Sequence, residues 1–284
     1  MKKLLLSAFV ICLAGTSIAQ ESPLWMRHCA LSPDGTTIAF TYKGDIYTVP
    51  STGGRATQIT TNPAFDTEPV WSPDSKQIAF ASDRMGSLDV FVVSSEGGAP
   101  QRLTTHSGSE KPVAYKDNKH ILFTANIAPS AEDAGFPSGQ FQQVYEVAVT
   151  GGRPAMFSSM PMECISINKE GVMLYQDKKG YEDYWRKHQV SPIARDIWTY
   201  TPGKKPVYQK QTTFGGEDRE PVWSPDGKSF YYLSEEKGSF NIFQRTPGTT
   251  TSQQITLHTK HPVRFLSIST TGTLCYGYDG EIYT

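Results

Sequence analysis

The sequence predicts an all-β protein, a six-bladed β-propeller of four-stranded antiparallel blades whose last blade is incomplete. Three observations predict it: a turn motif that recurs, a strand signature that occurs six times, and a spacing close to the length of one blade. Helical periodicity of the apolar residues is absent over any useful length. An internal repeat decides the fold when one is present, since each repeat forms one unit of structure.

The turn motif is most complete at residues 220–228, which read Glu-Pro-Val-Trp-Ser-Pro-Asp-Gly-Lys. Residues 68–76 repeat it with one change, and residues 31–35 keep Leu-Ser-Pro-Asp-Gly. Proline presets φ, the aspartate side chain caps the turn, and glycine or serine tolerates the tight exit. A serine that occurs in three copies of a turn is not expected to be a nucleophile, so we predict an architectural role for the motif.

The strand signature is a polar residue, then Ile or Val, then an aromatic residue. Its six copies start at Asp45, Asp89, Gln143, Asp196, Asn241 and Glu281. These starts are 44, 54, 53, 45 and 40 residues apart, and a propeller blade of four short strands takes about 40–45 residues. β-branched and aromatic residues at alternating positions also suit stacked sheets. Six blades are expected to begin near residues 28, 69, 112, 164, 221 and 263.

The N-terminus reads as a secretory signal peptide over residues 1–20, with basic Lys2 and Lys3, an apolar run over 4–14 and small residues before the cleavage site. The apolar run is too short to cross a bilayer. The mature chain, residues 21–284, is therefore expected to be periplasmic or secreted, with no membrane span. Without the two leader lysines, 25 of the 27 Lys and Arg remain against 28 Asp and Glu. This balance gives no electrostatic reason to bind nucleic acid.

Cysteine and histidine indicate neither a disulfide framework nor a metal site. The mature chain keeps Cys29, Cys164 and Cys275, which are odd in number and widely spaced, so they are interpreted as isolated buried thiols. His258 and His261 form a close pair, but no third ligand lies at a suitable spacing. They are interpreted as linker residues, and no metal or other cofactor is expected.

Two repeats are lengthened by insertions, at residues 126–142 and 178–195. The composition of the first is that of a surface loop. The second interleaves aromatic with basic residues, and insertions within repeats often lie on the binding face. Its candidate substrate-binding residues are Trp185, Arg186, Lys187, His188 and Arg195.

Two roles are open for these basic side chains. Arginine forks hold carboxylates such as a peptide C-terminus, or they pair with acidic neighbours and pin the insertion. The acidic neighbours in the sequence are Glu182, Asp183 and Asp196. Pinning is the favoured interpretation, and catalytic residues are not expected in this chain because Gly-x-Ser-x-Gly is absent.

The residues that precede or enter the inner strands also have two interpretations. Trp71 and Trp223 are expected to pack between blades. Four carboxylates accompany them: Asp66, Glu68, Asp218 and Glu220. They could form an acidic ring for a cation or peptide amines, but capping of backbone amides is favoured.

The Ser-Pro-Asp-Gly turns, with their Gly-Gly-x-x-x-x-[Leu/Ile]-Thr links, resemble TolB-type propellers. The second insertion, together with residues 23–27 and 262–268, resembles the N-terminal six-bladed propeller of exported tricorn-type serine peptidases. This resemblance covers the mature chain. It implies that a second propeller, a PDZ-like domain and peptidase domains follow, and that the nucleophile and base lie there. It also implies that this chain is a non-catalytic module.

The final residues, 272–284, parallel residues 35–48 and break off where a further strand is due. Such an end leaves an exposed sheet edge. Either residues 22–27 fill that edge or the chain is a fragment of a longer protein, which is the favoured interpretation.

The leading functional hypothesis is a propeller that gates or recruits peptides for a tricorn-type serine peptidase. Its partners would be peptides or unfolded protein and the C-terminal domains of the same parent protein. The alternative is a free-standing TolB-like interaction scaffold of the periplasm. An oligosaccharide-processing propeller is disfavoured because no metal-ligand cluster is present, and self-association is left open.

Overall fold

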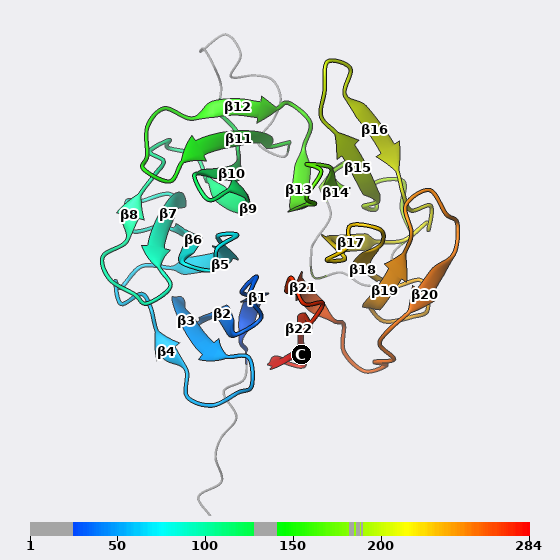
Figure 1. Ribbon diagram of the computed structural model, residues 1–284, viewed down its shortest axis with the longest axis horizontal. Helices are drawn as coiled ribbons and strands as arrows, with labels where there is room; N and C mark the ends of the chain where they lie inside the picture. The colour runs from blue at the N-terminus through cyan, green and yellow to red at the C-terminus, as the bar shows by residue number, and fades with distance from the viewer. Residues whose placement is uncertain (1–24, 128–140, 182–184, 186–187, 189) are drawn as a thin grey trace, which may run out of the picture.

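The computed structural model describes residues 25–127, 141–181, 185, 188 and 190–284. Six antiparallel sheets follow one another around a ring, and each is built from consecutive strands (Figure 1). The six-bladed propeller is therefore confirmed. Five blades have four strands and the sixth has three. The proposed leader and most of the first insertion lie outside the described residues.

The strand bounds are as follows. Blade 1 comprises β1 (Arg27–Leu31), β2 (Thr37–Tyr42), β3 (Asp45–Pro50) and β4 (Thr57–Gln58); blade 2 comprises β5 (Asp66–Trp71), β6 (Gln77–Ser82), β7 (Asp89–Ser94) and β8 (Gln101–Arg102); blade 3 comprises β9 (Lys111–Asp117), β10 (His120–Ala125), β11 (Gln143–Ala148) and β12 (Ala155–Ser158). Blade 4 comprises β13 (Met162–Ile167), β14 (Met173–Asp177), β15 (Ile197–Thr201) and β16 (Val207–Lys210); blade 5 comprises β17 (Asp218–Trp223), β18 (Phe230–Ser234), β19 (Asn241–Arg245) and β20 (Ser252–Gln254); blade 6 comprises β21 (Arg264–Ile268), β22 (Leu274–Tyr278) and β23 (Glu281–Tyr283).

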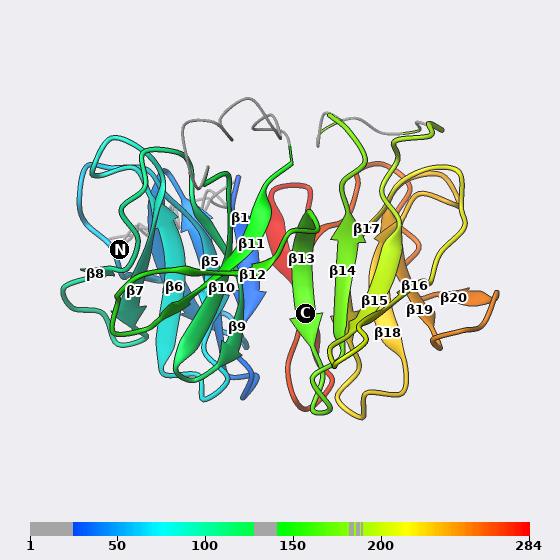
Figure 2. The same cartoon turned by 90° about the horizontal axis from the view of Figure 1, so that it is seen from above.

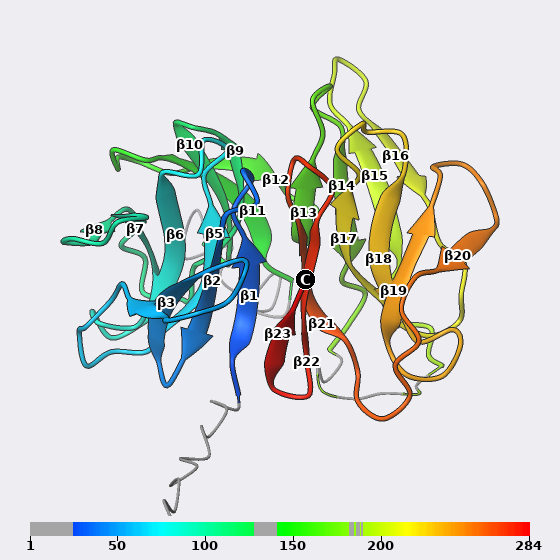
Figure 3. The same cartoon turned by 60° about the horizontal axis from the view of Figure 1, so that its bottom comes forward.

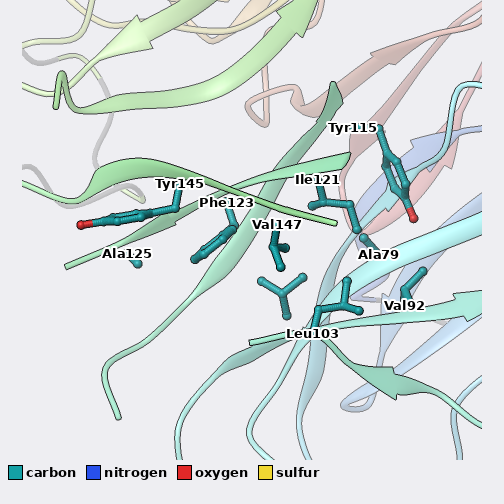
Figure 4. Close-up of a cluster of buried hydrophobic side chains, with 10 residues drawn as sticks. Ala79, Val92, Leu103, Tyr115, Ile121, Phe123, Ala125, Tyr145 and Val147 are labelled. Atoms are coloured by element: carbon teal, nitrogen blue, oxygen red, sulfur yellow. The ribbon is translucent and has the colours of Figure 1, made fainter. Parts of the chain in front are cut away.

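The first strand of every blade faces the axis, and the blades stand upright between the two faces of the ring (Figures 1 and 2). Apolar side chains fill the space between neighbouring blades. Between blades 2 and 3, for example, Val92 and Leu103 pack with Tyr115, Ile121 and Phe123 (Figure 4). Because β-branched and aromatic residues alternate along the strands, each sheet offers an apolar surface to both neighbours.

The repeated turn is held by its own side chains. In the copy at Ser72, the hydroxyl donates to Oδ1 of Asp74 at 2.7 Å and accepts the N–H of Gln77 at 2.9 Å. The copies at Ser32 and Ser224 repeat both bonds. The serine hydroxyl lowers the pKa of the aspartate in all three copies. The architectural role predicted for the motif is confirmed.

The threonines of three Leu/Ile-Thr links, and Thr212 at the matching place in blade 4, have an equally local explanation. The hydroxyls of Thr60, Thr104, Thr212 and Thr256 each accept a backbone N–H at the start of the third strand of the same blade, all at 2.9 Å. In blade 2 the donor is Val90, and the hydroxyl of Thr104 is buried there. Each threonine thus fastens the chain leaving the fourth strand to the third strand.

The two tryptophans of the long motif join neighbouring blades, as predicted. Trp71 of blade 2 donates its indole N–H to the carbonyl of Ala30 in blade 1 at 2.8 Å. Trp223 of blade 5 donates to the carbonyl of Val172 in blade 4 at 3.1 Å. Both indoles belong to apolar clusters shared by the two blades they join.

The first strands carry a bulge that links the blades. In five of them the described backbone has a non-glycine residue of positive φ: His28, Glu68, Cys164, Glu220 and Phe265. In each of those strands the pairing register shifts at this point. A bulge turns a side chain out of the normal alternation, and at His28, Glu68, Glu220 and Phe265 it turns toward the next blade.

The bulge contacts follow one another around the ring. His28 is hydrogen-bonded to Thr67 of blade 2 at 3.1 Å, and Glu68 pairs with Lys111 of blade 3 at 2.6 Å. Glu220 accepts the N–H of Leu266 in blade 6 at 2.8 Å. These contacts give two of the four inner-strand carboxylates a pairing or capping role between blades.

The other two carboxylates are fully buried. Asp66 pairs with Arg84 at 3.0 Å, whereas burial raises the pKa of Asp218 to about 7. Of the four carboxylates, Glu220 caps a backbone N–H and Asp66 and Glu68 form ion pairs, and the burial of Asp66 and Asp218 argues against an acidic ring open to ligands.

Blades 1 and 6 close the ring by packing face to face, with β1 beside β21 and β22 (Figure 3). The rings of Phe265 and His28 lie 4.7 Å apart, and Met26 donates its N–H to the carbonyl of Gly280 at 3.1 Å. Within the described residues β23 pairs only with β22. Residues 25–27 therefore lie against the β22–β23 turn and at the start of β1, and do not add a strand to blade 6.

Replacement of Thr104 by valine should destabilise the fold by about 1–3 kcal/mol, because it leaves the buried N–H of Val90 without its acceptor. Urea unfolding measures the change. Thr105→Val, on an exposed neighbour, is the control and should change the free energy of unfolding by less than about 0.5 kcal/mol. Equal effects of the two variants would contradict the proposed role of the link.

A buried carboxyl between blades 2 and 3 should make stability depend on pH. Burial raises the pKa of Glu110 to about 7, so the folded chain retains a proton that the unfolded chain releases near pH 4.5. This contribution to stability therefore falls as pH rises from about 4.5 to 7. Glu110→Gln removes it, so the variant should gain stability relative to wild type over that range. Urea unfolding at several pH values tests this, with exposed Glu96→Gln as control; parallel profiles for Glu110→Gln and wild type would exclude it.

Candidate functional site: a pocket at the seam between blades 1 and 6

A pocket of about 460 Å³ lies where blade 6 meets blade 1, and we call it the seam pocket. Its lining comes from three parts of the chain: the segment entering β1, the second insertion, and the segment from the approach to β21 through the β22–β23 turn. The lining residues are Trp25, Met26, Arg27, Trp185, His261, Pro262, Arg264, Phe265, Gly277, Tyr278, Asp279 and Gly280.

Two arginines and two tryptophans form the centre of the pocket. The guanidinium of Arg27 lies 5.2 Å from the ring centroid of Trp25 and 5.1 Å from that of Trp185. The guanidinium of Arg264 lies 4.6 Å from the same Trp185 ring. Cation–π attraction holds each guanidinium against an aromatic face. The four side chains thus form one stack that ties the insertion to both blades of the seam.

This stack can bind a ligand that is partly apolar and partly anionic. Trp25 and Trp185 are 69% and 50% exposed, so the exposed part of each indole can contact an apolar group. A guanidinium keeps its N–H donors at the edge when its face lies on an aromatic ring, and those donors match a carboxylate. Within the described chain no carboxylate forms an ion pair with Arg27.

The rim of the pocket is closed by residues of blade 6 and its approach. His261 lies 3.3 Å from a carboxylate oxygen of Asp279, and His258 stacks on Tyr278 with ring centroids 3.8 Å apart. Tyr278 also meets the ring of His261 edge-on, with centroids 6.0 Å apart, so it lies between the two histidines. Among the residues that the structure describes, no group of three or more His, Cys, Asp or Glu side chains is placed to hold a metal ion.

The structure separates the five candidate binding residues. Trp185 lines the seam pocket. His188 lies elsewhere, with a backbone N–H that donates to the side chain of Glu235 and a ring nitrogen 3.9 Å from the same carboxylate. Arg186 and Lys187 lie outside the described residues.

Arg195 is buried and takes the pinning role. It is 5% exposed and pairs with Glu163 at 3.1 Å and with Glu217 at 3.4 Å. Burial would raise the pKa of Glu163, but Arg195 and Lys178 outweigh it and lower that pKa. Arg195 therefore joins the second insertion to β13 and to the start of β17.

The partners of Arg195 differ from the acidic neighbours considered in the sequence. Asp196 pairs with Lys179, and with Lys210 at 2.8 Å; Glu182 and Asp183 lie outside the described residues. Asp196 therefore does pair with a basic residue of the insertion, but not with Arg195, because adjacent residues of an extended chain point in opposite directions.

Sequence reasoning missed Trp25, Arg27 and Arg264 as site residues. They stand in the two stretches that resemble tricorn-type propellers, but they were not singled out as ligand-binding candidates. The available signal was the pairing of an arginine at the start of β1 with one at the start of β21, the two strands that meet when a ring closes.

The chain matches a known family over nearly its whole described length. Residues 23–284 match the model of the tricorn protease N-terminal β-propeller domain. The chain belongs to this family.

Among the residues described, no helix is both long enough and apolar enough to cross a membrane.

Two relatives among known proteins differ in how much of their length this propeller covers. Tricorn protease homolog 1 of Streptomyces coelicolor is 39% identical over 213 residues, which are 74% of this chain and 19% of that protein. The uncharacterized protein Atu1656 of Agrobacterium fabrum is 34% identical over 218 residues, 72% of this chain and 68% of that protein. The chain thus spans about a fifth of the tricorn homolog.

Two solved structures share the fold. The crystal structure of the tricorn protease matches with a TM-score of 0.76 at 17% identity, covering 92% of this chain and 25% of that one. TolB from Acinetobacter baumannii matches with a TM-score of 0.62 at 15% identity, covering 88% of this chain and 66% of that one. The expected resemblance to tricorn-type and TolB-like propellers is confirmed at the level of the fold.

Removal of the Arg195 guanidinium should destabilise this tricorn-family propeller by about 1.5–3 kcal/mol, because Arg195→Ala removes a cation that two carboxylates share, leaving Glu163 with Lys178 and Glu217 with Arg219. Urea unfolding measures the loss. Arg153→Ala, on an exposed arginine, is the matched control and should be nearly neutral. A change below 1 kcal/mol in Arg195→Ala would show that the pairs do not pin the insertion.

Proposed function

We propose that this propeller is a non-catalytic module that recruits peptides for a tricorn-type serine peptidase, and that the seam pocket is where the peptide docks. One observation carries the proposal: the stack of Trp25, Arg27, Trp185 and Arg264. It joins aromatic faces to guanidinium donors in a pocket of about 460 Å³.

The chemistry of the stack suits the end of a peptide. A C-terminal carboxylate would accept hydrogen bonds from Arg27, and the preceding apolar side chain would lie against the exposed part of Trp25 or Trp185. Folded proteins present few such ends, whereas peptides and unfolded chains present them freely. The pocket would therefore select by the free end and apolar character of the ligand.

The serine hydroxyls of the repeated Ser-Pro-Asp turn form hydrogen bonds that stabilise the fold. Ser32, Ser72 and Ser224 are buried and donate to the aspartate of their own turn. A serine nucleophile needs an adjacent base and an open approach, so these positions favour a module without a catalytic centre. Proteolysis would be carried out by other domains of the parent protein, which would be the partners of this propeller.

Export fits the same proposal. The leader-like residues 1–20 would direct the protein to the periplasm or outside the cell, where it would meet peptides of the cell envelope. Tricorn protease homolog 1 is one relative of this chain, and the proposed parent would follow its domain plan.

A free-standing interaction scaffold is the second candidate. It is supported by Atu1656, of which this propeller alone covers 68%. In that case the seam pocket would bind a segment of a folded envelope protein, and a free carboxylate would not matter. The two candidate functions can therefore be distinguished by whether binding requires a free C-terminal carboxylate on the ligand.

Peptide binding tests the proposal. Fluorescence polarisation of labelled peptides with an apolar C-terminal residue should detect binding to the wild-type chain. Replacement of the carboxylate by an amide should weaken it about 10–100-fold, the loss expected for a charge-assisted hydrogen bond. Trp185→Ala and Arg27→Ala should each weaken it to a similar extent.

The control is Phe65→Ala, which removes an aromatic side chain that is also 50% exposed but lies outside the pocket. It should leave the affinity unchanged. Equal affinity for acid and amide peptides, with a loss only in the pocket variants, would favour the scaffold. Binding that none of the pocket variants alters would exclude the seam pocket for both candidates.

A further inference from the structure

Two of the cysteines meet inside the seam. Cys29 lies on β1 of blade 1 and Cys275 on β22 of blade 6, and they are 4% and 0% exposed. Both belong to the apolar cluster that packs these blades together. Both are free, buried thiols, as interpreted from the sequence, but they share one cluster although they are 246 positions apart, from 29 to 275.

Two hydrogen bonds hold the part of β1 that carries Cys29 against blade 6. The Cys29 thiol lies 3.4 Å from the carbonyl oxygen of Phe265, to which it donates. Two residues along β1, the N–H of Leu31 donates to the hydroxyl of Ser267 at 3.0 Å, and Ser267 is the register partner of Cys275. These bonds hold Cys29 against β21 and β22, and the apolar cluster at this point contains both Cys29 and Cys275.

Within the described residues no strand passes from one blade into another sheet, so the seam is closed by side-chain packing and a few hydrogen bonds. The remaining bonds across it run from Met26 to Gly280 and from Thr270 to the carbonyl of Pro33, at 3.1 and 2.8 Å. A covalent bond at this point would restrain the unfolded chain strongly, because the stabilisation from a cross-link grows with the length of the loop it closes.

We propose that Cys29 and Cys275 form a disulfide that latches blade 1 to blade 6. The oxidant is a protein or small-molecule disulfide of an oxidising compartment. One thiolate attacks it to give a mixed disulfide, and the second displaces the other half. The Sγ–Sγ bond forms, the two cysteines lose two protons and two electrons, and the oxidant is reduced to two thiols.

The closed ring protects the pair. The adjacent Cys275 thiol and burial raise the pKa of the Cys29 thiol, so little thiolate is present in the folded chain. The exchange therefore takes place while blades 1 and 6 are still apart, during folding, and it is slow once the seam has closed. Cys164, on β13 of blade 4, is not in the seam cluster and provides the internal control.

Alkylation followed by peptide mapping tests the disulfide. The mature chain is refolded with oxidised and reduced glutathione, unfolded in guanidinium without reductant, treated with iodoacetamide and digested. The expected result is alkylation of Cys164 alone, together with a cross-linked peptide pair that contains Cys29 and Cys275. Alkylation of all three cysteines, or a cross-link involving Cys164, would overturn the proposal.

Thermal unfolding with and without dithiothreitol gives a second measurement. The oxidised wild-type chain should unfold about 5–10 °C higher than the reduced chain, and so should Cys164→Ala. The double variant Cys29→Ala and Cys275→Ala should show no such difference. If that variant does not fold, the peptide map of the wild-type chain still decides. A fall in unfolding temperature on reduction that persists in the folded double variant would exclude the latch.

Discussion

The left-handed bulge residue of the inner strands is the constraint on which the propeller depends. A non-glycine residue in this region costs on the order of 1–3 kcal/mol, and five first strands accept that cost at a corresponding place. In return, the bulge points a side chain away from its own sheet and toward the next blade, where it can form a contact. His28 reaches Thr67, Glu68 reaches Lys111, and Glu220 reaches a backbone N–H of blade 6. The ring is therefore held near its axis by polar contacts and farther out by apolar packing between sheets.

The sequence predicted what depends on neighbouring residues. The Ser-Pro-Asp turns, the tryptophans that follow Pro-Val and the number of blades all come from short patterns whose physical cause is local, such as the hydroxyl of Ser72 on Asp74. What failed was long-range pairing. Arg195 pairs with residues of the first strands of blades 4 and 5 or just before them, and Cys29 meets a residue 246 positions away. Strand periodicity fixes which face a side chain occupies but not which blade it meets there.

The second insertion shows how one loop serves two purposes. Arg195, at its end, is buried between two carboxylates and fixes the loop to the inner strands. Trp185, ten residues earlier, is half exposed and reaches across to the seam. A loop anchored only at its exposed part would lose much of its binding energy to ordering. The ion pairs of Arg195 form on folding, so under the proposed function they would reduce the cost of ordering this end of the insertion when a ligand binds.

The seam pocket has walls from both blade 1 and blade 6, and this arrangement couples two equilibria. Separation of the blades destroys the pocket, so a ligand bound there favours the closed ring by mass action. By thermodynamic reciprocity, whatever holds the blades together raises the affinity of the pocket by the same factor. A single coupling free energy therefore links ligand binding at the seam pocket to closure of the ring, so a change in one would alter the other.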